Sequence, residues 1–502
     1  MESGGFSRFE GDEPVMDVLR EGTMSKPYKD LREWIGLVDE LGELRRIRGA
    51  EWNLEMGAIT ELIGREGKYP PPAILFDDIP GYPKGFRTIF GTTGSVQRIA
   101  LTLGLSDVKT GTQLIRAYRE KSKALTPIPP KVVETGPIFE NIDSGKHVDL
   151  LKFPVPMMHE KDGGRYIGTN CLVITKHPDE GWVNIGTYRV MVHGKDYTAF
   201  YISPGKHGRI HRDLYFERKE PCPVIVCVGH DPLLFLAAGN EVAYGLSEYD
   251  YAGGFKGEPI EVVKGKHTGL PIPAYAEIAF EGEAVWDDRK KEGPFGEWTG
   301  YYASGEREEP VIRVKNVYYR NNPILTCSKP SRPPSDYSFS KGIVKSALIW
   351  EELEKCGVPN VKGVWCHEAG GGRLFNVVSI KQSYPGHSRQ AGLITSQTHA
   401  GGYLNRFVIV VDEDIDPSNL FDVAWAMSTR CDPVEDIDIL RKCWSGPLDP
   451  ILPAGEKGLN SRAVIDACRP YAWKDDFPAV AECSKELRDK TYTKWKDILG
   501  LV

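Results

Sequence analysis

The chain has 502 residues, of which 41% are hydrophobic and 26% are charged, and its formal net charge at pH 7 is -7. A chain of this length exceeds one hydrophobic core, so we expect two to four domains of ordinary globular composition. The negative charge argues against a nucleic-acid partner, because nucleic-acid binding needs clustered basic surface.

Nothing in the sequence indicates a membrane segment, an export signal or a disulfide framework. The longest apolar run, 222–239, is interrupted by His230 and Asp231 and is too short to span a bilayer. The N-terminal residues lack the charged and then apolar pattern of a signal peptide. None of the ten cysteines forms a C-x-x-C pair, which argues against a zinc knuckle. We therefore expect a cytoplasmic protein without a membrane partner.

The first part of the chain combines helix and strand patterns. Residues 1–23 are polar and aperiodic, and we expect a flexible extension. Residues 24–126 predict a small N-terminal α+β domain, in which apolar residues from Leu31 to Leu41 follow one helical face. Further elements are expected at 53–64 (helix), 73–76 (strand) and 88–90 (strand).

A proline-rich stretch, "PIPPKVVETGP", begins a β-rich second domain over 127–328. Residues 165–177 and 181–193 predict two long strands joined by a hairpin turn, "PDEG". Other strand-like runs lie at 222–228, 259–263, 276–286 and 311–319. Many strands with few helices favour a barrel or a sandwich.

The sequence "KPSRPPSDYS" breaks the pattern again and opens a linker helix within 329–356. Strand and helix patterns then alternate over 357–483, which predicts a C-terminal α/β domain. A last helix within 484–502 carries Leu487, Thr491, Trp495 and Ile498 on one side. Such a face packs either on its own body or on another subunit, and the sequence does not choose between them.

Two carboxylates flank a sharp turn in "EGPFGE", residues Glu292 to Glu297. The Gly-Pro-Phe-Gly turn aims both acids at one point, and Phe295 keeps that point dry. A carboxyl group against apolar surface has a raised pKa and donates a proton at neutral pH when a nearby cation offsets the second carboxylate. The alternative is a surface turn with two solvated acids.

Asn184 and Arg189 stand out in the strand-like sequence "VNIGTYRVMVHG". An arginine on a buried strand needs acidic partners, because an unpaired buried charge is costly, and Glu292 and Glu297 would supply them. Asn184 and Arg189 are five residues apart, so their side chains would lie on opposite faces of a regular strand. They therefore serve two sites, or a bulge lies between them. The alternative is an arginine on the barrel surface.

The sequence "SPGKHGRIHRD" contains His207 and His211. Two histidines four residues apart on a helix can bind zinc, but no H-E-x-x-H pattern supports this. A second possibility combines the Asn184 oxygen, one histidine nitrogen and Glu248. This set suits Mn²⁺ or Mg²⁺ completed by phosphate oxygens and water. The glycine-rich pieces "GTTGS" and "EAGGGR" match no phosphate-binding pattern and are more typical of turns.

Taken in order, these motifs resemble the UbiD-type decarboxylases, which use prenylated FMN. The resemblance runs from about Tyr28 to the C-terminus. Its motifs are Asn184-x-x-x-x-Arg189, Lys206-His207, Glu248, "EGPFGE", "YRNNPI" (319–324), "YPGH" (384–387) and "VVDEDID" (410–416) followed by "TRCDP" (429–433).

The resemblance implies an α+β multidomain chain whose central, flavin-reductase-like split β-barrel holds the cofactor, with a C-terminal α/β domain used in dimerisation or larger homo-oligomers. It implies reversible, non-oxidative decarboxylation of an aromatic or heteroaromatic acid. The cofactor takes up the electrons that CO₂ leaves behind, which no ordinary side chain does. A separate flavin prenyltransferase would supply it.

The resemblance also implies residue roles. Arg189 would clamp the substrate carboxylate, Glu292 would donate the proton, and Glu297 would hold both in register. Mn²⁺ (or Mg²⁺) would bridge Asn184, His207 and Glu248 to the cofactor phosphate, with K⁺ beside it. The remaining implied contacts are to the cofactor from Ile185, Lys206 and Arg406, and to the substrate from Ser203 and Trp298.

Two features depart from the family's usual pattern. Arg406 stands where many members have a lysine, which keeps the charge but changes its geometry. Trp298 offers a large flat surface that suits an aromatic or heteroaromatic ring. The predicted substrate is such a ring acid, with or without a polar substituent on the ring. Two other functions remain open on the same barrel, a flavin-dependent oxidoreductase and a non-catalytic flavin-binding subunit.

Overall fold

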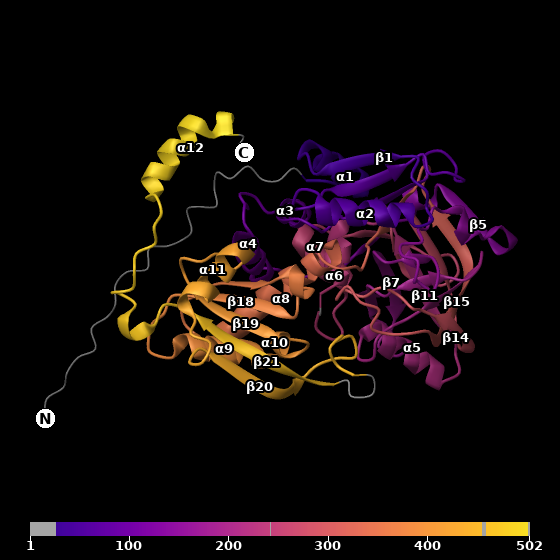
Figure 1. Ribbon diagram of the computed structural model, residues 1–502. Helices are drawn as coiled ribbons and strands as arrows, with labels where there is room; N and C mark the ends of the chain where they lie inside the picture. The colour runs from indigo at the N-terminus through magenta and orange to yellow at the C-terminus, as the bar shows by residue number, and fades with distance from the viewer. Residues whose placement is uncertain (1–26, 241, 454–457, 500–502) are drawn as a thin grey trace, which may run out of the picture.

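The structure is a computed structural model that describes residues 27–240, 242–453 and 458–499 (Figure 1). The extension expected over 1–23 lies outside these residues. In Figure 1 the N-terminal and central parts of the chain lie together on one side, and the C-terminal sheet with its helices lies on the other. Helix α8 (Asp336–Lys355) leads from the first side to the second.

The N-terminal sheet has the strand order β1-β2-β3-β16 and carries the expected helices. Helix α1 begins after its cap Asp30 and buries Trp34 and Val38, as the periodicity predicted, whereas Leu41 is half exposed at the helix end. The fourth strand comes from the chain that follows the central sheet, so the N-terminal sheet is not built from residues 24–126 alone. The elements are α1 (Leu31–Glu40), β1 (Leu44–Arg48), α2 (Glu55–Glu66), β2 (Ala73–Asp77), β3 (Arg87–Phe90), α3 (Val96–Leu103), α4 (Gly111–Lys123) and β16 (Ile324–Cys327).

The central sheet is antiparallel and curls into an open half-barrel. Its order is β6-β9-β10-β15-β14-β11-β7-β8, with β5 paired to β15. Alternate residues of β11 pack into two different hydrophobic cores, so both faces of the sheet are buried at this strand. This explains why the sequence of β11 is a continuous apolar run. The strands are β5 (Asn141–Ser144), β6 (Tyr166–Gly168), β7 (Cys171–Lys176), β8 (Val183–Gly186), β9 (Val190–Val192), β10 (Tyr197–Phe200), β11 (Cys222–Val228), β14 (Ile278–Glu292) and β15 (Arg307–Tyr319).

The predicted hairpin is confirmed, because β7 and β8 pair antiparallel across "PDEG". The prediction of two long strands is wrong, since each is interrupted. Strand β8 pairs with β7 at one end of the sheet, while β9 pairs with β6 and β10 at the other end. The short segment 187–189 therefore crosses the seam between the two ends of the curled sheet. This crossing, rather than a bulge, separates Asn184 from Arg189.

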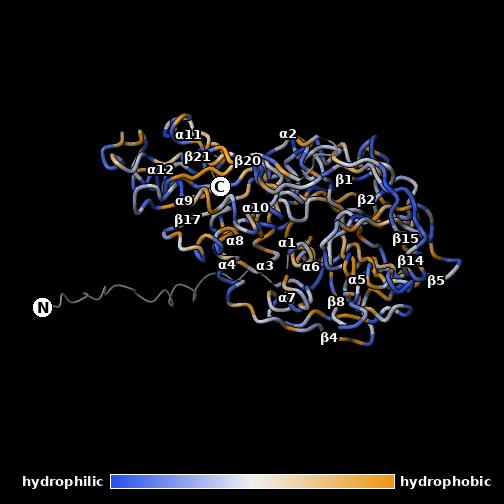
Figure 2. The backbone as a smooth tube through the Cα atoms, turned by 90° about the horizontal axis from the view of Figure 1, so that it is seen from below, coloured by the Kyte–Doolittle hydropathy of each residue, from blue (hydrophilic) through white to orange (hydrophobic). Residues whose placement is uncertain are grey.

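Three helices and a small sheet cover the outside of the half-barrel. Helices α5 and α7 both begin against β8, which places their first residues near Asn184. Figure 2 shows apolar segments, in orange, concentrated within the central and C-terminal parts of the chain. The elements are β4 (Lys131–Val132), α5 (His207–Glu217), α6 (Pro232–Ala238), α7 (Glu248–Lys256), β12 (Glu261–Lys264) and β13 (Pro271–Pro273).

The C-terminal part is an α/β sandwich, as predicted. Its sheet has the order β17-β18-β19-β21-β20, and β18, β19 and β21 run parallel. Helices α8 and α9 share one apolar core with one face of the sheet, and α11 shares another core with the opposite face. The elements are β17 (Val361–Cys366), β18 (Phe375–Ile380), α9 (His387–Gln397), α10 (His399–Gly402), β19 (Phe407–Asp412), α11 (Leu420–Arg430), β20 (Ile437–Trp444) and β21 (Leu459–Ala467).

The last helix, α12 (Lys485–Leu499), extends away from the body of the chain (Figure 1). None of its described residues is buried, and Ile498 of the predicted apolar face is 77% exposed. The helix is therefore confirmed, but it does not pack on its own body here. Residues 500–502 lie outside the described part. Among the helices that the structure describes, none combines the length and apolar character needed to cross a membrane.

Candidate active site

Arg189 lies between the two carboxylates of the "EGPFGE" turn. Its Nε and Nη2 donate to Glu292 Oε1 and Oε2 at 2.7 and 2.9 Å. Its Nη1 donates to Glu297 Oε1 at 2.7 Å. The three side chains are largely buried, and Glu292 is 0% exposed. The structure thus brings Arg189 to two glutamates that follow it by 103 and 108 positions, and it disfavours both a surface turn and a surface arginine.

The turn that carries the two glutamates is held by a neighbouring glycine loop. Glu292 is the last residue of β14, and Gly293 adopts a φ of +88°, which favours glycine. Gly163 N donates to Pro294 O at 2.7 Å, and a Cβ on Gly163 would lie only 2.0 Å from Gly293 O. The backbone approach at Gly163 therefore leaves no room for a side chain.

Phe295 closes the turn with an aromatic contact. Its ring lies 4.1 Å from that of Tyr166, centroid to centroid, and both side chains are buried. The Tyr166 hydroxyl donates to Glu292 Oε1 at 3.0 Å. Phe295 is buried beside the carboxylates, which agrees with the apolar cover expected for it, and Tyr166 adds a hydrogen bond that the sequence did not reveal.

The two glutamates have different environments. Both oxygens of Glu292 accept from Arg189, and one also accepts from Tyr166. Glu297 contacts Arg189 through one oxygen only. Burial raises the pKa of the Glu297 carboxyl, although the charge of Arg189 opposes that shift. Glu297 is therefore held by fewer hydrogen bonds than Glu292, and its raised pKa favours the protonated form of its carboxyl group.

A second arginine extends the ion-pair cluster. Arg307 Nε lies 3.9 Å from Glu292 Oε2 and 3.9 Å from Glu309 Oε1, and the Arg307 guanidinium stacks over the Tyr201 ring at 4.0 Å. Sequence reasoning missed Arg307. The pairing register of β14 with β15 would have identified Arg307, because Arg307 lies directly opposite Glu292 in that pair.

On the other side of the seam, Glu248 lies against β8. Ile185 N donates to Glu248 Oε2 at 2.6 Å, and Glu248 is 3% exposed. No ion pair to Glu248 occurs among the described residues. Burial raises the pKa of this carboxyl to about 8, despite the backbone hydrogen bond. A buried carboxylate without a cation is what a metal site presents before the metal binds.

Asn184 and His207 lie beside this carboxylate. Asn184 precedes Ile185 on β8 and is 2% exposed, with no partner for its Nδ2 among the described residues. His207 is the first residue of α5, directly after Lys206, and its ring contacts Trp182 at 5.3 Å. Tyr188, two residues after β8, contacts the start of α5, since its hydroxyl accepts from Gly208 N at 3.2 Å.

The donor set of amide, imidazole and carboxylate fits a hard divalent cation. Within the described residues, no three His, Cys, Asp or Glu side chains gather as metal ligands, and this set holds only two such residues. His211 instead faces the core, where its Nδ1 lies 3.0 Å from Thr175 Oγ1 and burial lowers its pKa to about 3. The contacts of His211 do not favour a zinc site shared with His207.

The remaining predicted residues have the following positions. Ser203 Oγ lies 3.4 Å from the Tyr201 hydroxyl, beside the arginine cluster. Trp298 is buried under Arg373 of the C-terminal part, whose guanidinium carbon lies 5.0 Å from the Trp298 ring. Arg406 donates from Nη2 to both oxygens of buried Asp449, at 2.7 and 2.6 Å. Its expected contact with a cofactor remains a prediction.

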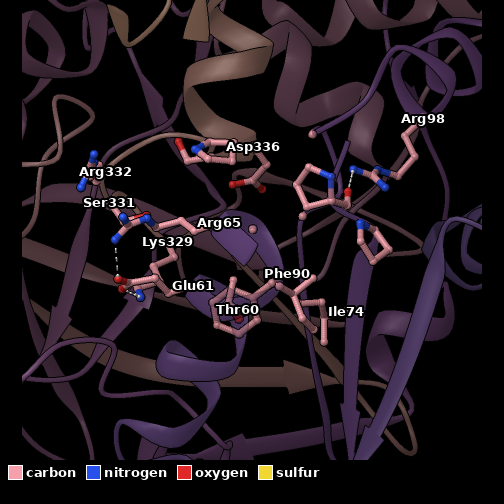
Figure 3. Close-up of a pocket in the computed structure, with 18 residues that line it drawn as sticks. Thr60, Glu61, Arg65, Ile74, Phe90, Arg98, Lys329, Ser331, Arg332 and Asp336 are labelled. Carbon is pink, nitrogen blue, oxygen red and sulfur yellow. Dashed lines mark hydrogen bonds and ion pairs between the residues drawn. The ribbon is translucent and has the colours of Figure 1, made fainter. Parts of the chain in front are cut away.

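A separate small pocket of about 40 Å³ lies between α2, β3 and the segment after β16 (Figure 3). Lys329 and Asp336 point into it, and Lys329 Nζ donates to Glu61 at 2.8 Å. None of the predicted site residues lines this pocket. The segment after β16 also touches the "EGPFGE" turn, because a Cβ on Gly296 would lie 2.8 Å from Pro330 O.

Three family models match consecutive parts of the chain. They describe the N-terminal domain (residues 35–118), the Rift-related domain (131–333) and the C-terminal domain (339–467) of UbiD, 3-octaprenyl-4-hydroxybenzoate carboxy-lyase. Phenolic acid decarboxylase of Bacillus subtilis is 33% identical over 456 residues, which cover 89% of this chain and 93% of the relative. Pyrrole-2-carboxylic acid decarboxylase of Pseudomonas aeruginosa is 31% identical over 498 residues, covering 94% and 99%.

Solved structures agree with the sequence matches. Vanillic acid decarboxylase of Sedimentibacter hydroxybenzoicus, in open form, superposes with a TM-score of 0.83 at 28% identity, covering 94% of this chain and 100% of that chain. The UbiD-class enzyme HmfF of Pelotomaculum thermopropionicum, in complex with FMN, superposes with a TM-score of 0.82 at 26% identity, covering 92% and 100%. An evolved dimeric form of HmfF, in complex with prFMN, has a TM-score of 0.78 at 26% identity, covering 91% and 98%.

Proposed function

Since this chain belongs to the UbiD family of carboxy-lyases, we propose that it decarboxylates an aromatic or heteroaromatic carboxylic acid, reversibly and without net oxidation, with prenylated FMN as cofactor. The observation that carries the proposal is the buried cluster of Arg189 with Glu292 and Glu297. The names of the relatives, which act on phenolic and pyrrole-2-carboxylic acids, support the substrate class.

Arg189 would hold the substrate carboxylate. A guanidinium has five N–H donors, and the hydrogen bonds to the two glutamates occupy three of them. The remaining donors on Nη1 and Nη2 are free to bind a carboxylate, a charge-assisted contact worth about 1.5–3 kcal/mol. Because Glu292 holds the guanidinium through two parallel bonds, it sets the direction in which those donors point.

Proton transfer is better assigned to Glu297 than to Glu292, which the sequence favoured for this role. When the bond between the ring carbon and the carboxylate breaks, CO₂ leaves and its bonding electrons stay with the rest of the substrate. Prenylated FMN, when bound, supplies the acceptor for those electrons. Glu297 would then donate its proton to the ring carbon and regain one from water, whereas Glu292 stays paired as a carboxylate.

Asn184, His207 and Glu248 would hold Mn²⁺ or Mg²⁺, and through it the cofactor phosphate, with K⁺ beside it. The buried, unpaired Glu248 supports this assignment. Ile185, Lys206 and Arg406 would make further cofactor contacts, and Ser203 and Trp298 would line the substrate pocket. Arg406 would have to leave or share Asp449 to reach the cofactor.

We further propose that the curled sheet is a split barrel of the flavin-reductase type within a domain spanning 127–328. A small N-terminal domain (24–126), a linker helix (329–356), a C-terminal domain (357–483) and a C-terminal helix (484–502) would complete the chain. The C-terminal domain would form a homodimer or larger homo-oligomer. A flavin prenyltransferase would supply the cofactor.

The test is to co-express the protein with a flavin prenyltransferase and to record the absorption spectrum and mass of the released flavin. We expect a species heavier than FMN by one prenyl unit, and CO₂ release from at least one aryl or heteroaryl acid. Plain FMN, or no flavin in well-folded protein, would favour an oxidoreductase or a non-catalytic carrier. Much faster turnover of cinnamate-type alkenyl acids would contradict the proposed substrate class.

A further inference from the structure

A short turn formed by residues 159–163 packs against the start of the "EGPFGE" turn. Its backbone is closed by Asp162 N, which donates to His159 O at 3.1 Å, as in a β-turn. Asp162 Oδ2 accepts from His159 N at 3.1 Å, so the side chain closes the same turn a second time. Gly163 N donates to Pro294 O at 2.7 Å. The 159–163 turn is therefore a compact support beside the "EGPFGE" turn.

The side chain of Asp162 also reaches the end of the segment that carries Glu297. The Tyr302 hydroxyl donates to Asp162 Oδ1 at 2.9 Å. Within the segment, Glu297 N donates to Tyr301 O at 3.1 Å, and Gly300 N donates to Glu297 O at 2.8 Å. The tyrosine that Asp162 binds is thus the next residue after the one that anchors the Glu297 backbone.

The His159 ring supports the middle of the same segment. A Cβ added to Gly296 would lie 3.5 Å from His159 Cε1 and 2.8 Å from Pro330 O, so the backbone at Gly296 is enclosed from two sides. The His159 ring also lies edge-on to the Tyr302 ring, with 6.4 Å between the centroids. One turn therefore contacts the segment 293–302 at its start, its middle and its end.

Asp162 is a buried carboxylate that joins two segments. Its side chain is 1% exposed, and among the described residues its ion pairs include no lysine or arginine. One oxygen, Oδ2, accepts from the 159–163 turn, where His159 Nδ1 also lies 3.3 Å away. The other oxygen, Oδ1, accepts from Tyr302. A buried carboxylate is costly unless hydrogen bonds satisfy it, and an asparagine has only one acceptor oxygen for these contacts. Both oxygens are therefore needed to join the turn to the segment.

The position of Glu297 depends on this support more than that of Glu292 does. Arg189 binds both oxygens of Glu292 but only one oxygen of Glu297. Glu292 also ends the long strand β14, whereas Glu297 lies in the turn that follows it. Because its side chain has one anchor, the backbone of the segment determines where the Glu297 carboxyl lies. A displacement of about 1 Å at a reacting group can cost about 10²-fold in rate.

We propose that Asp162 is a positioning residue, which holds the segment 293–302 through the 159–163 turn and the Tyr302 hydroxyl and so fixes the Glu297 carboxyl at the place from which it donates its proton. The inference rests on the proposed function, because it takes Glu297 as the proton donor. Asp162 acts through the backbone and through Tyr302, and not on the substrate. Without its two contacts the segment opens more often, and Glu297 spends less time in the reactive position.

The first test measures amide hydrogen exchange by mass spectrometry in the full-length, flavin-free protein. Asp162→Ala removes both acceptor oxygens, and Tyr302→Phe removes only the hydroxyl that binds Asp162. We expect the amides of 293–302 to exchange about tenfold or more faster in each variant, because the segment loses a hydrogen bond to a charged group. Exchange in the remote strand β17 should stay unchanged, which separates local opening from global unfolding.

The matched control is Tyr301→Phe. Tyr301 is 63% exposed, and its hydroxyl has no partner among the described residues, so exchange in this variant should equal that of the wild type. Thermal unfolding reports whether each variant is folded, and Tyr302→Phe carries the test if Asp162→Ala does not fold. Wild-type exchange over 293–302 in folded Tyr302→Phe, or equally faster exchange in Tyr301→Phe, would overturn the inference.

The second test uses the cofactor-loaded proteins and the aryl or heteroaryl acid from which the wild type releases CO₂. In Asp162→Ala and Tyr302→Phe, kcat should fall about tenfold or more, while KM, which depends on Arg189 in the proposed function, changes less than about twofold. Asp162→Asn keeps one acceptor oxygen for Tyr302 and should recover part of kcat. A raised KM with unchanged kcat, or no recovery in Asp162→Asn, would contradict a positioning role toward Glu297.

The two tests distinguish this inference from the proposed function. If the cofactor-loaded wild type releases CO₂ from no acid, the proposed function fails. Hydrogen exchange over 293–302 is read without cofactor or substrate, so it still decides whether Asp162 and Tyr302 hold the segment.

Discussion

Two groups of buried polar residues lie on either side of the seam crossed by residues 187–189, and they differ in charge balance. On one side Arg189 compensates Glu292 and Glu297 within the protein. On the other side Glu248 is as deeply buried but has no cation among the described residues. The first group is complete in the free protein, and the second needs a ligand to become so. The chain therefore preforms its proposed chemical centre, whereas a metal ion would complete its proposed cofactor anchor.

The largest expected effect comes from breaking the compensated side. Arg189→Met leaves two buried carboxylates without their cation, and removing one partner of a buried pair costs about 3–5 kcal/mol. We expect a loss of that order in the free energy of unfolding, measured with urea, and no detectable CO₂ release. Arg307→Met, which lies at 3.9 Å from Glu292, is the matched control and should cost less. Equal losses in both variants would contradict the central role of Arg189.

The second prediction separates the two glutamates. Glu297→Gln keeps the hydrogen bond to Arg189 but cannot donate a proton, so kcat should fall by about 10²–10⁴ while flavin binding, followed by absorbance, is retained. Glu292→Gln should act mainly through the direction of Arg189, and so raise KM as well as lower kcat. If only Glu292→Gln abolishes turnover while flavin stays bound, the proton donor is Glu292, as the sequence suggested.

The third prediction concerns the uncompensated side. In metal-free protein the raised pKa of Glu248, about 8, means that the folded state holds a proton that the unfolded state has released above its ordinary pKa. The free energy of unfolding should therefore fall as pH rises from about 5 to 8. Mn²⁺ should remove this loss by binding the ionised carboxylate, and Glu248→Gln should remove both effects. The measurement is urea unfolding across pH with EDTA or with Mn²⁺.

A different result would change the comparison between the two sides. If the pH dependence of wild type and Glu248→Gln is the same, another group carries the titration. If Mn²⁺ stabilises both proteins equally, the metal binds elsewhere. In either case Glu248 would no longer distinguish the two sides of the seam.

The smallest effect is expected from Tyr166→Phe. This change removes the hydroxyl that donates to Glu292 Oε1 at 3.0 Å but keeps the ring that packs on Phe295. A single hydrogen bond of this kind is worth about 1 kcal/mol, or about a fivefold change in kcat/KM. We expect nearly unchanged stability, measured by urea unfolding, because Arg189 still holds both oxygens of Glu292. A loss as large as that of Arg189→Met would show that Tyr166 takes part in the chemistry directly.

The sequence by itself predicted which residues come together at the centre of the candidate site, Arg189 with Glu292 and Glu297. Two local patterns made this possible. Asn184 and Arg189 are polar side chains among apolar neighbours, and two acids flank a glycine-proline turn. A buried charge is costly without a partner, so both patterns predict polar contacts. Helix and strand periodicity also predicted the α/β character of the C-terminal part and the hairpin of β7 with β8.

Only the tertiary structure decided how these residues are paired. The interruption at 187–189 arises because β8 and β9 join opposite ends of one curled sheet, and this depends on long-range strand pairing. Tyr166 on β6 and Arg307 on β15 reach Glu292 from two separate segments, so no spacing in the sequence connects them. Short-range patterns in the sequence indicate which apolar side chains must be buried and which buried polar side chains need a partner. The long-range closure of the sheet determines which partner each of them has.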